Sequence, residues 1–472
     1  MNHKNRLSAL LLPILLAATL AACDNRQEKA QEAYAEYQAA IVNGDLRTAR
    51  RALAELVAAD DSNADYWLEL AKVSMQLQAY SAAYDAFQRA HELDRGNVEV
   101  LQTMTQLALQ SGNLDLAGEN AKQLELLAPT NPAVPLTFGY IALRRGDYAE
   151  AERQVAALTA LLPYDGSGKV LQSRILMAQN KIDAAVDLLR EQIRQQPSDV
   201  QSLRALASIY ELREHWPETA EVLRAYLGYS QDDAAARIRL VNAELRAGGI
   251  EPAASVTLAA IGKEDVDKLL APWLAVGKQD QIADQLYEGA QTANVGRRIA
   301  VARFLASTDQ SARVLELVAN EASLPVKAAN VIPNALYGAA LVQSGRVQEG
   351  STRLDSVLKI DGNNREALRA RAMLRSQTGD HKGAIEDAQK LVAADQDSAR
   401  GRLLLARIYG AAGDSDNMRR TLWDGFHQVG DNREIFDALR SLVAKSDGPQ
   451  AAERLSQEFY DLRYQQLTRS VA

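Results

Sequence analysis

The sequence predicts an all-α protein built as a solenoid of stacked helical hairpins, and two observations carry this prediction. Ala, Leu, Gln, Asp and Arg are abundant while aromatic residues make up only 6% of the 472 residues, a composition that favours helices over strands. Small residues also recur at a fixed step of 34, which is typical of repeat architectures. Each unit of such an array buries its apolar face only against its neighbours, so a long chain needs no large globular core.

The 34-residue step appears in three sets of positions, and each set has a mechanical reason. We place a series of mostly small residues on the second helix of each hairpin, where two helices approach closely. The series is Ala49, Ala83, Ala117, Ala151, Ala185, Thr219 and Ala253, then in a shifted phase Gly350, Ala384, Met418 and Ala452. Glycines suit the positive φ of the turn inside the hairpin: Gly112, Gly146, Gly248, Gly345, Gly379 and Gly413. Prolines after the second helix end it: Pro129, Pro163 and Pro197.

These positions, with large residues at fixed offsets, resemble the tetratricopeptide (TPR) family. The repeat from Pro132 matches at Phe138, Gly139, Ala142, Gly146, Tyr148, Ala151 and Pro163, the repeat from Ala64 at Trp67, Leu70, Ala71, Tyr80, Ala83, Phe87 and Ala90, and the repeat from Ala399 at Leu405, Ala406, Tyr409, Gly413 and Leu422. The resemblance covers about thirteen hairpins between residues 27 and 472. It implies a TPR-like α-solenoid, a right-handed superhelix whose first helices line a concave groove for peptides or partner helices.

The repeat pattern changes between residues 264 and 325. The step from Ala253 to Gly350 is 97 residues instead of 102, so the phase slips by five. Apolar residues still recur at helical spacing and predict two short hairpins, containing Val266, Leu269, Leu270, Trp273 and Leu274, and Ile299, Ala300, Phe304 and Leu305. We therefore expect an N-terminal array over 23–263, irregular hairpins over 264–325, and a C-terminal array over 326–472 ending in a long capping helix. The superhelix either runs unbroken through the irregular part or is jointed there.

Residues 1–22 have the three parts of a secretory signal: a basic start, an apolar run from Leu7 to Leu20, and small residues before Cys23. The run is too short for a comfortable transmembrane helix, which needs about 20 apolar residues. Leu20–Cys23 resembles the lipobox of bacterial lipoproteins, which implies lipidation of Cys23 and a membrane anchor. The alternative is an ordinary cleaved signal with a chance cysteine. Asp24 resembles the inner-membrane retention signal, so we expect the periplasmic side of the inner membrane ahead of the outer membrane.

The charge of the chain argues against nucleic acid as a partner. The sequence pI is near 5.4 and the net charge is −8, so no global positive field favours a polyanionic duplex. Cleavage before Cys23 would remove two basic residues and no acids, which gives −8 − 2 = −10. We expect such an acidic body to stand off an anionic membrane surface, held by its lipid.

The sequence offers little that points to catalysis, a cofactor or a metal. The five histidines lie in the signal or in separate repeats, and distant repeats of a solenoid do not converge on one metal ion. Gly166–Lys169 looks like part of a phosphate-binding loop, but the spacing fails because Pro163 stands where the first glycine should be, and no strand precedes it. We therefore expect no enzyme, no cofactor and no metal site.

The expected groove follows from the register of the first helices. The lining should include Lys72, Gln106, Tyr140, Ser208 and Asn242, with arginines at or within one turn of these positions: Arg144, Arg174, Arg204 and Arg246. Arg144, Arg174 and Arg204 step diagonally over three hairpins and could hold an acidic segment or an anionic polymer, because guanidinium groups bind carboxylate and phosphate in a bidentate manner. The alternative is ordinary surface arginine paired with nearby Asp and Glu.

The resemblance then suggests what the protein does. We expect a membrane-anchored, periplasm-facing scaffold or adaptor for protein or peptide partners in envelope assembly, such as exopolysaccharide export or protein secretion. Outer-membrane protein assembly and the peptidoglycan machinery are alternative settings. An enzyme would need polar side chains that converge in a pocket, which the sequence does not indicate.

Overall fold

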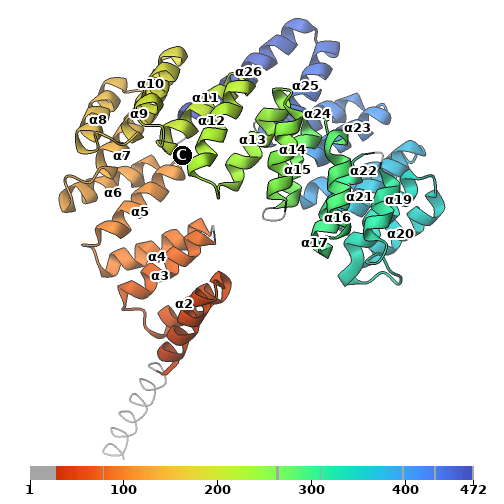
Figure 1. The fold of residues 1–472 in the computed structure, drawn as a ribbon, viewed down its shortest axis with the longest axis horizontal. Coiled ribbons are helices and arrows are strands. Elements are labelled where there is room, and N and C mark those ends of the chain that lie inside the picture. Colours follow the sequence, from red (N-terminus) through yellow and green to blue (C-terminus); the bar gives the residue numbers. More distant parts are fainter. Residues whose placement is uncertain are drawn as a thin grey trace, which may run out of the picture. The chain divides into compact units, whose positions relative to one another are not determined.

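The computed structural model of the protein describes residues 28–77, 79–261, 265–308, 310–395, 398–429 and 432–469. Within these ranges the regular structure is entirely helical and no strand occurs, which confirms the all-α prediction (Figure 1). The proposed signal and Cys23 lie outside the described residues. The chain forms two compact units, the first reaching to Leu188 and the second comprising Leu189–Leu467, and the boundary falls inside α10.

Helices in the first unit pair as successive hairpins. They are a stretch over residues 28–42, α2 (Leu46–Ala59), α3 (Ala64–Gln76), α4 (Tyr80–Leu93), α5 (Val98–Gln110), α6 (Leu114–Leu127), α7 (Ala133–Arg145), α8 (Tyr148–Leu161), α9 (Ser167–Ala178) and α10 (Ile182–Gln195), which continues into the second unit. Helix α3 packs on α4, α5 on α6 and α7 on α8, and each hairpin also contacts the next.

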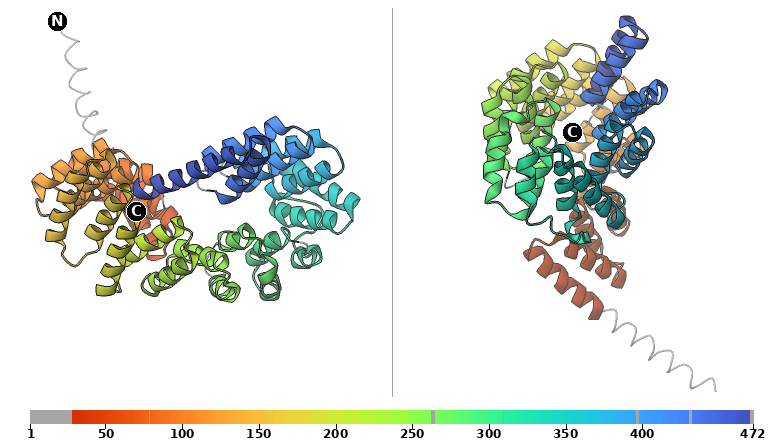
Figure 2. Two further views of the ribbon diagram at one scale, coloured as in Figure 1. Left: turned by 90° about the horizontal axis from the view of Figure 1, so that it is seen from above. Right: turned by 90° about the vertical axis from the view of Figure 1, so that its right-hand side faces the viewer.

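The second unit continues the same plan along a curved path from α11 to α26 (Figure 2). Its helices are α11 (Val200–Leu212), α12 (Trp216–Tyr229), α13 (Ala234–Arg246), α14 (Ile250–Ala260), α15 (Val266–Ala275), α16 (Asp280–Gln291), α17 (Val295–Leu305), α18 (Ser311–Val318), α19 (Val331–Gln343) after a short 3₁₀ turn at Ala328–Asn330, α20 (Val347–Ile360), α21 (Arg365–Gln377), α22 (His381–Ala394), α23 (Ala399–Ala411), α24 (Ser415–Val429), α25 (Arg433–Ser446) and α26 (Pro449–Arg469). The described residues thus contain thirteen hairpins, as predicted, and α26 is the expected long terminal helix at 21 residues.

The recurring small residues lie where two helices meet. Ala49, Ala83, Ala117 and Ala151 are completely buried on the second helices of their hairpins. At Gly350 of α20 the approach is closer still, because a Cβ there would stand 2.7 Å from the carbonyl oxygen of Gly338 in α19. The interval of 34 residues therefore marks the closest approach of the two helices, where small side chains predominate and Met418 of α24 is the exception, packed against Gly410 of α23. The glycines of the second set, Gly146 among them with φ of 76°, take the left-handed conformation in the intervening turns.

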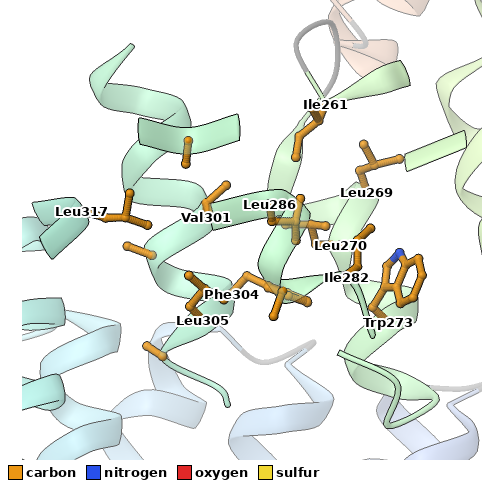
Figure 3. Close-up of a cluster of buried hydrophobic side chains, with 14 of the residues drawn as sticks. Ile261, Leu269, Leu270, Trp273, Ile282, Leu286, Val301, Phe304, Leu305 and Leu317 are labelled. Carbon is orange, nitrogen blue, oxygen red and sulfur yellow. The ribbon is translucent and has the colours of Figure 1, made fainter. Parts of the chain in front are cut away.

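The phase slip has a local cause in shortened helices. α15, α17 and α18 have 10, 11 and 8 residues, whereas most helices of the regular repeats have 13 or 14. The two short hairpins predicted over 264–325 are present, as α15–α16 and α17–α18. One continuous core cluster runs through them from α13 to α19 and includes Trp273, Leu286 and Val301 (Figure 3). The expected boundaries at 263 and 325 stay predictions, as does a joint between them.

Candidate partner-binding surface

In the second unit, the first helices of several successive hairpins line a groove that consists of two adjoining hollows. One has a volume of about 550 Å³ and the other about 720 Å³. Both are lined by α15, α19, α21 and α23, with α17 in the smaller and Glu434 of α25 in the larger, and they share Leu274, Ser307, Arg369 and Arg400. Because each odd-numbered helix opens its hairpin, the lining follows the rule expected from the repeat. We call this surface the unit 2 groove.

Arginines without acidic partners mark the floor of the unit 2 groove. Arg369 of α21 and Arg400 and Arg407 of α23 line it, and none of the three forms an ion pair or hydrogen bond within the described residues. Arg400 and Arg407 are exposed and lie two helical turns apart, on one face of α23, while Arg369 is partly buried. Arg303 differs, because its guanidinium bonds Asp267 and, at 2.7 Å, Glu366. The lining holds five arginines and four carboxylates, a net charge of +5 − 4 = +1, and the excess lies with arginines that form no close ion pair.

Electrostatics at the groove floor favour an anionic ligand. Burial lowers the pKa of Arg369, and Arg400, Arg303 and Arg365 lower it further, while Glu366 opposes them. The guanidinium stays protonated at neutral pH, so a lowered pKa means a cation held at a cost in free energy. Burial raises the pKa of Glu434 at the end of the groove, although Arg400 and Arg246 oppose this. A ligand carboxylate beside Arg369 would supply the close ion pair that Glu366, which is engaged by Arg303, does not provide.

The residues expected to line one groove differ in exposure and in their partners. Lys72 of α3 is engaged by Glu69 and Glu99, each 3.4 Å from its Nζ. Gln106 of α5 and Arg144 of α7 are exposed. Tyr140 and Arg174, however, are only 4% and 6% exposed, and the Arg174 guanidinium stands 5.6 Å from the Tyr140 ring centre. This corrects the expected lining, because a buried arginine stacked on a tyrosine offers almost no surface to a partner.

The expected diagonal of three arginines is divided between the two units. Arg144 and Arg174 belong to the first unit, and exposed Arg204 on α11 belongs to the second. Ser208 accepts a hydrogen bond of 3.1 Å from Arg239. Asn242 and Arg246 are half-buried in a separate cavity of the second unit. The groove arginines at 369, 400 and 407 were not predicted, although a signal existed: in the shifted phase the lining position recurs as Ala339, Met373 and Arg407, all of which line the groove.

The described residues contain neither a candidate membrane span nor a candidate metal site. No described helix combines the length and apolar character needed to cross a bilayer. In the same part of the chain, no three His, Cys, Asp or Glu side chains gather where they could hold a metal ion.

The family model that matches this chain supports the repeat interpretation. A tetratricopeptide repeat model matches residues 27–98, 170–236 and 338–399. No curated protein sequence matches the chain. Solved structures with similar folds include a tetratricopeptide repeat protein from Parabacteroides merdae, 15% identical, which covers 52% of this chain and 99% of its own with a TM-score of 0.39. YrrB, described as having an unusual peptide-binding site, is 19% identical and covers 36% and 87% (TM-score 0.31). Yeast Tom70 is 12% identical and covers 85% and 92% (TM-score 0.31).

Proposed function

We propose, from the premise that this chain contains tetratricopeptide repeats and has the fold of a protein-interaction scaffold, that its unit 2 groove binds an acidic, extended segment of a partner protein. The single observation that carries this proposal is the set of three arginines, at 369, 400 and 407, that lack acidic partners in a groove. Arginine binds carboxylates in a bidentate manner and is weakly hydrated, so it suits an interface with an acidic chain. The occupant that fits is a peptide whose Asp or Glu side chains reach these guanidinium groups.

The groove also offers apolar contact between its charges. Leu274 and Phe304 line one hollow, while Leu274 and Met373 line the other, so an acidic segment with interspersed apolar residues would satisfy both kinds of surface. Arg369 lies in the lining of both hollows. A carboxylate bound there would be partly shielded from water and would interact more strongly than one at an exposed rim. We expect Arg369 to contribute most of the binding energy.

The binding proposal is tested with a fluorescent decamer of glutamate and the full-length chain. We expect saturable binding by fluorescence anisotropy that weakens with added salt. Changing Arg369, Arg400 and Arg407 together to Gln should weaken it at least tenfold. The matched control changes to Gln three arginines outside the groove in the same unit: Arg194 on α10, Arg346 at the N-cap of α20 and Arg420 on α24. It removes the same charge outside the groove, so binding should change less than threefold.

Two results would contradict the proposal. Equal loss of affinity in the groove variant and the control variant would show that only net charge matters. Binding of a polyuronate chain in the groove without binding of the glutamate decamer would assign the surface to an anionic polysaccharide instead of a protein. Each variant needs an unchanged helical circular dichroism spectrum before its affinity is interpreted.

We further propose that the scaffold is lipid-anchored and faces the periplasm, where it assembles envelope machinery, with exopolysaccharide export or protein secretion as the favoured setting. The support is the lipobox-like segment Leu20–Cys23 and the following Asp24. Three acyl chains would hold the protein stably at a bilayer, since two or more suffice. The acidic composition leaves no electrostatic attraction to anionic lipid that could replace the anchor.

The anchor proposal predicts a simple change of location. Cys23→Ser should abolish incorporation of labelled palmitate and move the protein from the membrane fraction to the soluble fraction. Density-gradient separation of the membranes should place the unaltered protein with the inner membrane. Labelled palmitate retained by Cys23→Ser would reject the anchor, and a position in the outer-membrane fraction would reject the role given to Asp24.

A further inference from the structure

A small cavity within the second unit collects four arginines. It has a volume of about 260 Å³ and lies where the C-terminal hairpin α25–α26 meets helices α11 to α13. Its charged lining consists of Arg239, Arg246, Arg433 and Arg463 together with Glu211 and Glu214. These charged residues are separate from the unit 2 groove, because none of them lines either hollow of that groove.

Polar contacts connect the two sides of this cavity. Glu214, in the turn before α12, accepts hydrogen bonds from Arg433 and, at 3.2 Å, from the hydroxyl of Tyr460, residues 219 and 246 positions away. Arg463 adds an ion pair of 3.8 Å to the same carboxylate. The buried apolar residues of the two sides belong to separate core clusters. Charged and hydrogen-bonded groups therefore contribute to the contact between these ends of the unit.

One arginine in the cavity has no carboxylate of its own. Arg239 is held by both oxygens of Glu211 at 2.9 Å, and Arg433 and Arg463 share Glu214. Arg246 instead donates to the side-chain oxygen of Asn242 at 3.1 Å and stands 5.1 Å from the ring centre of Trp216. No carboxylate of the described residues pairs with it. Burial lowers the pKa of Arg246, and Arg433 and Arg463 lower it further against the opposing Glu214 and Asp437.

The charge of the lining sets what could neutralise it. Four arginines and two glutamates give +4 − 2 = +2. The lining itself keeps this excess, although two carboxylates outside it act on its arginines: Asp437, about half exposed, pairs with Arg433 at 3.0 Å, and Arg246 opposes the rise that burial causes in the pKa of Glu434. An oxyanion with one or two negative charges would balance this excess, and its oxygens match the donor forks of guanidinium groups. Phosphate at neutral pH has this charge.

We propose that this cavity binds a small oxyanion of the size and charge of phosphate, which bridges Arg246 on α13 to Arg433 and Arg463 on the C-terminal hairpin. The bound anion neutralises the repulsion between these arginines and so holds the two ends of the second unit together. Free phosphate, the phosphate group of a small ester and a small dicarboxylate share this chemistry. The volume is at the lower end of ligand sites, so the anion itself fills most of the cavity.

Isothermal titration calorimetry of the full-length chain with inorganic phosphate, at constant ionic strength, tests the site. We expect saturable binding with a dissociation constant below about 1 mM. Arg246→Gln should weaken phosphate binding at least tenfold. Arg246→Lys keeps the charge but loses the bidentate guanidinium, so its affinity should lie between those of the unaltered protein and Arg246→Gln. Arg420→Gln removes the same charge from an exposed position on α24 and should leave the affinity unchanged. Parallel titrations with glycerol phosphate and succinate identify which source of oxyanion the cavity prefers.

Hydrogen exchange supplies a second test. A nonspecific effect of the anion would slow α26 exchange equally in the unaltered protein and in Arg246→Gln. Phosphate should slow exchange of the α26 amides in the unaltered protein and not in Arg246→Gln, because the bridged arginines would tie α26 to α13. Equal phosphate affinity in the unaltered protein and Arg246→Gln would overturn the proposal, as would α26 exchange that phosphate leaves unchanged. The glutamate-decamer test of the unit 2 groove uses none of these arginines, so the two proposals fail independently.

Discussion

Replacing Trp273 with Ala is expected to lower the free energy of unfolding around α13 to α19 by about 3–5 kcal/mol. Trp273 is completely buried in the core cluster that joins the irregular hairpins to their neighbours (Figure 3). Its indole Nε1 also donates a hydrogen bond of 3.0 Å to the hydroxyl of Thr257 on α14. The substitution leaves a large cavity and removes this hydrogen bond, while the Thr257 hydroxyl still donates to the carbonyl of Ala253. Native-state hydrogen exchange, which reports each segment separately, measures the loss.

Two smaller substitutions separate the contributions of Trp273. Trp273→Phe keeps an aromatic ring in the core and should cost clearly less than Trp273→Ala. Thr257→Val keeps the volume but removes the acceptor of the indole hydrogen bond, which should cost about 1–3 kcal/mol because the buried N–H stays unpaired. Exchange in α3–α6 of the first unit is the internal control and should not change. A loss below about 1 kcal/mol for Trp273→Ala would show that this core collapses around the missing ring.

Asp387→Ala is expected to destabilise the C-terminal repeats by about 3–5 kcal/mol, because it removes the shared partner of two arginines. Asp387 of α22 is 1% exposed and accepts hydrogen bonds from Arg371, at 2.8 and 2.9 Å, and from Arg375, at 2.9 Å. The bonds to Asp387, with help from Asp355, raise the pKa of Arg371. Without Asp387 a largely buried guanidinium keeps its charge and loses most of its compensation. Hydrogen exchange of α21–α23 measures the change.

A compensated variant distinguishes lost pairing from lost packing at this network. Changing Arg371 and Arg375 to Met and Asp387 to Leu together removes every buried charge at once, and should recover most of the stability lost in Asp387→Ala. Glu349→Ala breaks a half-exposed pair with Arg346 on α20 and should cost less than about 1 kcal/mol. If Asp387→Ala cost no more than Glu349→Ala, solvent would have to reach the network freely, contrary to its burial.

Much of the architecture could be predicted because the repeat is a local property of the sequence. Ala83 and Ala117 recur at the step of one hairpin, and a small residue there is needed whatever the rest of the chain does. The same holds for Gly146 and Gly413, whose turns require positive φ. Even the short helices around Trp273 were visible in the apolar spacing, although that spacing did not show how much shorter than the regular helices they are.

The candidate sites could be predicted only in part. Register alone placed Tyr140 and Arg174 on a groove, but register cannot tell an exposed turn of a helix from one that the next hairpin covers. Arg407 could have been found by extending the same register past the phase slip. Its lack of an acidic partner could not, because ion pairing depends on which side chains from other helices come within reach.

The sequence by itself determined the helical hairpins, their number and their order, since each is specified by residues that lie within one or two repeats of each other. Only the tertiary structure decided that Glu214 meets Arg433 and Tyr460 across more than two hundred residues. That contact depends on the sum of small rotations between successive hairpins, with the shortened helices α15 to α18 among them. No pair of neighbouring residues encodes such a sum, so charge from opposite ends of the unit comes together in a way that spacing could not reveal.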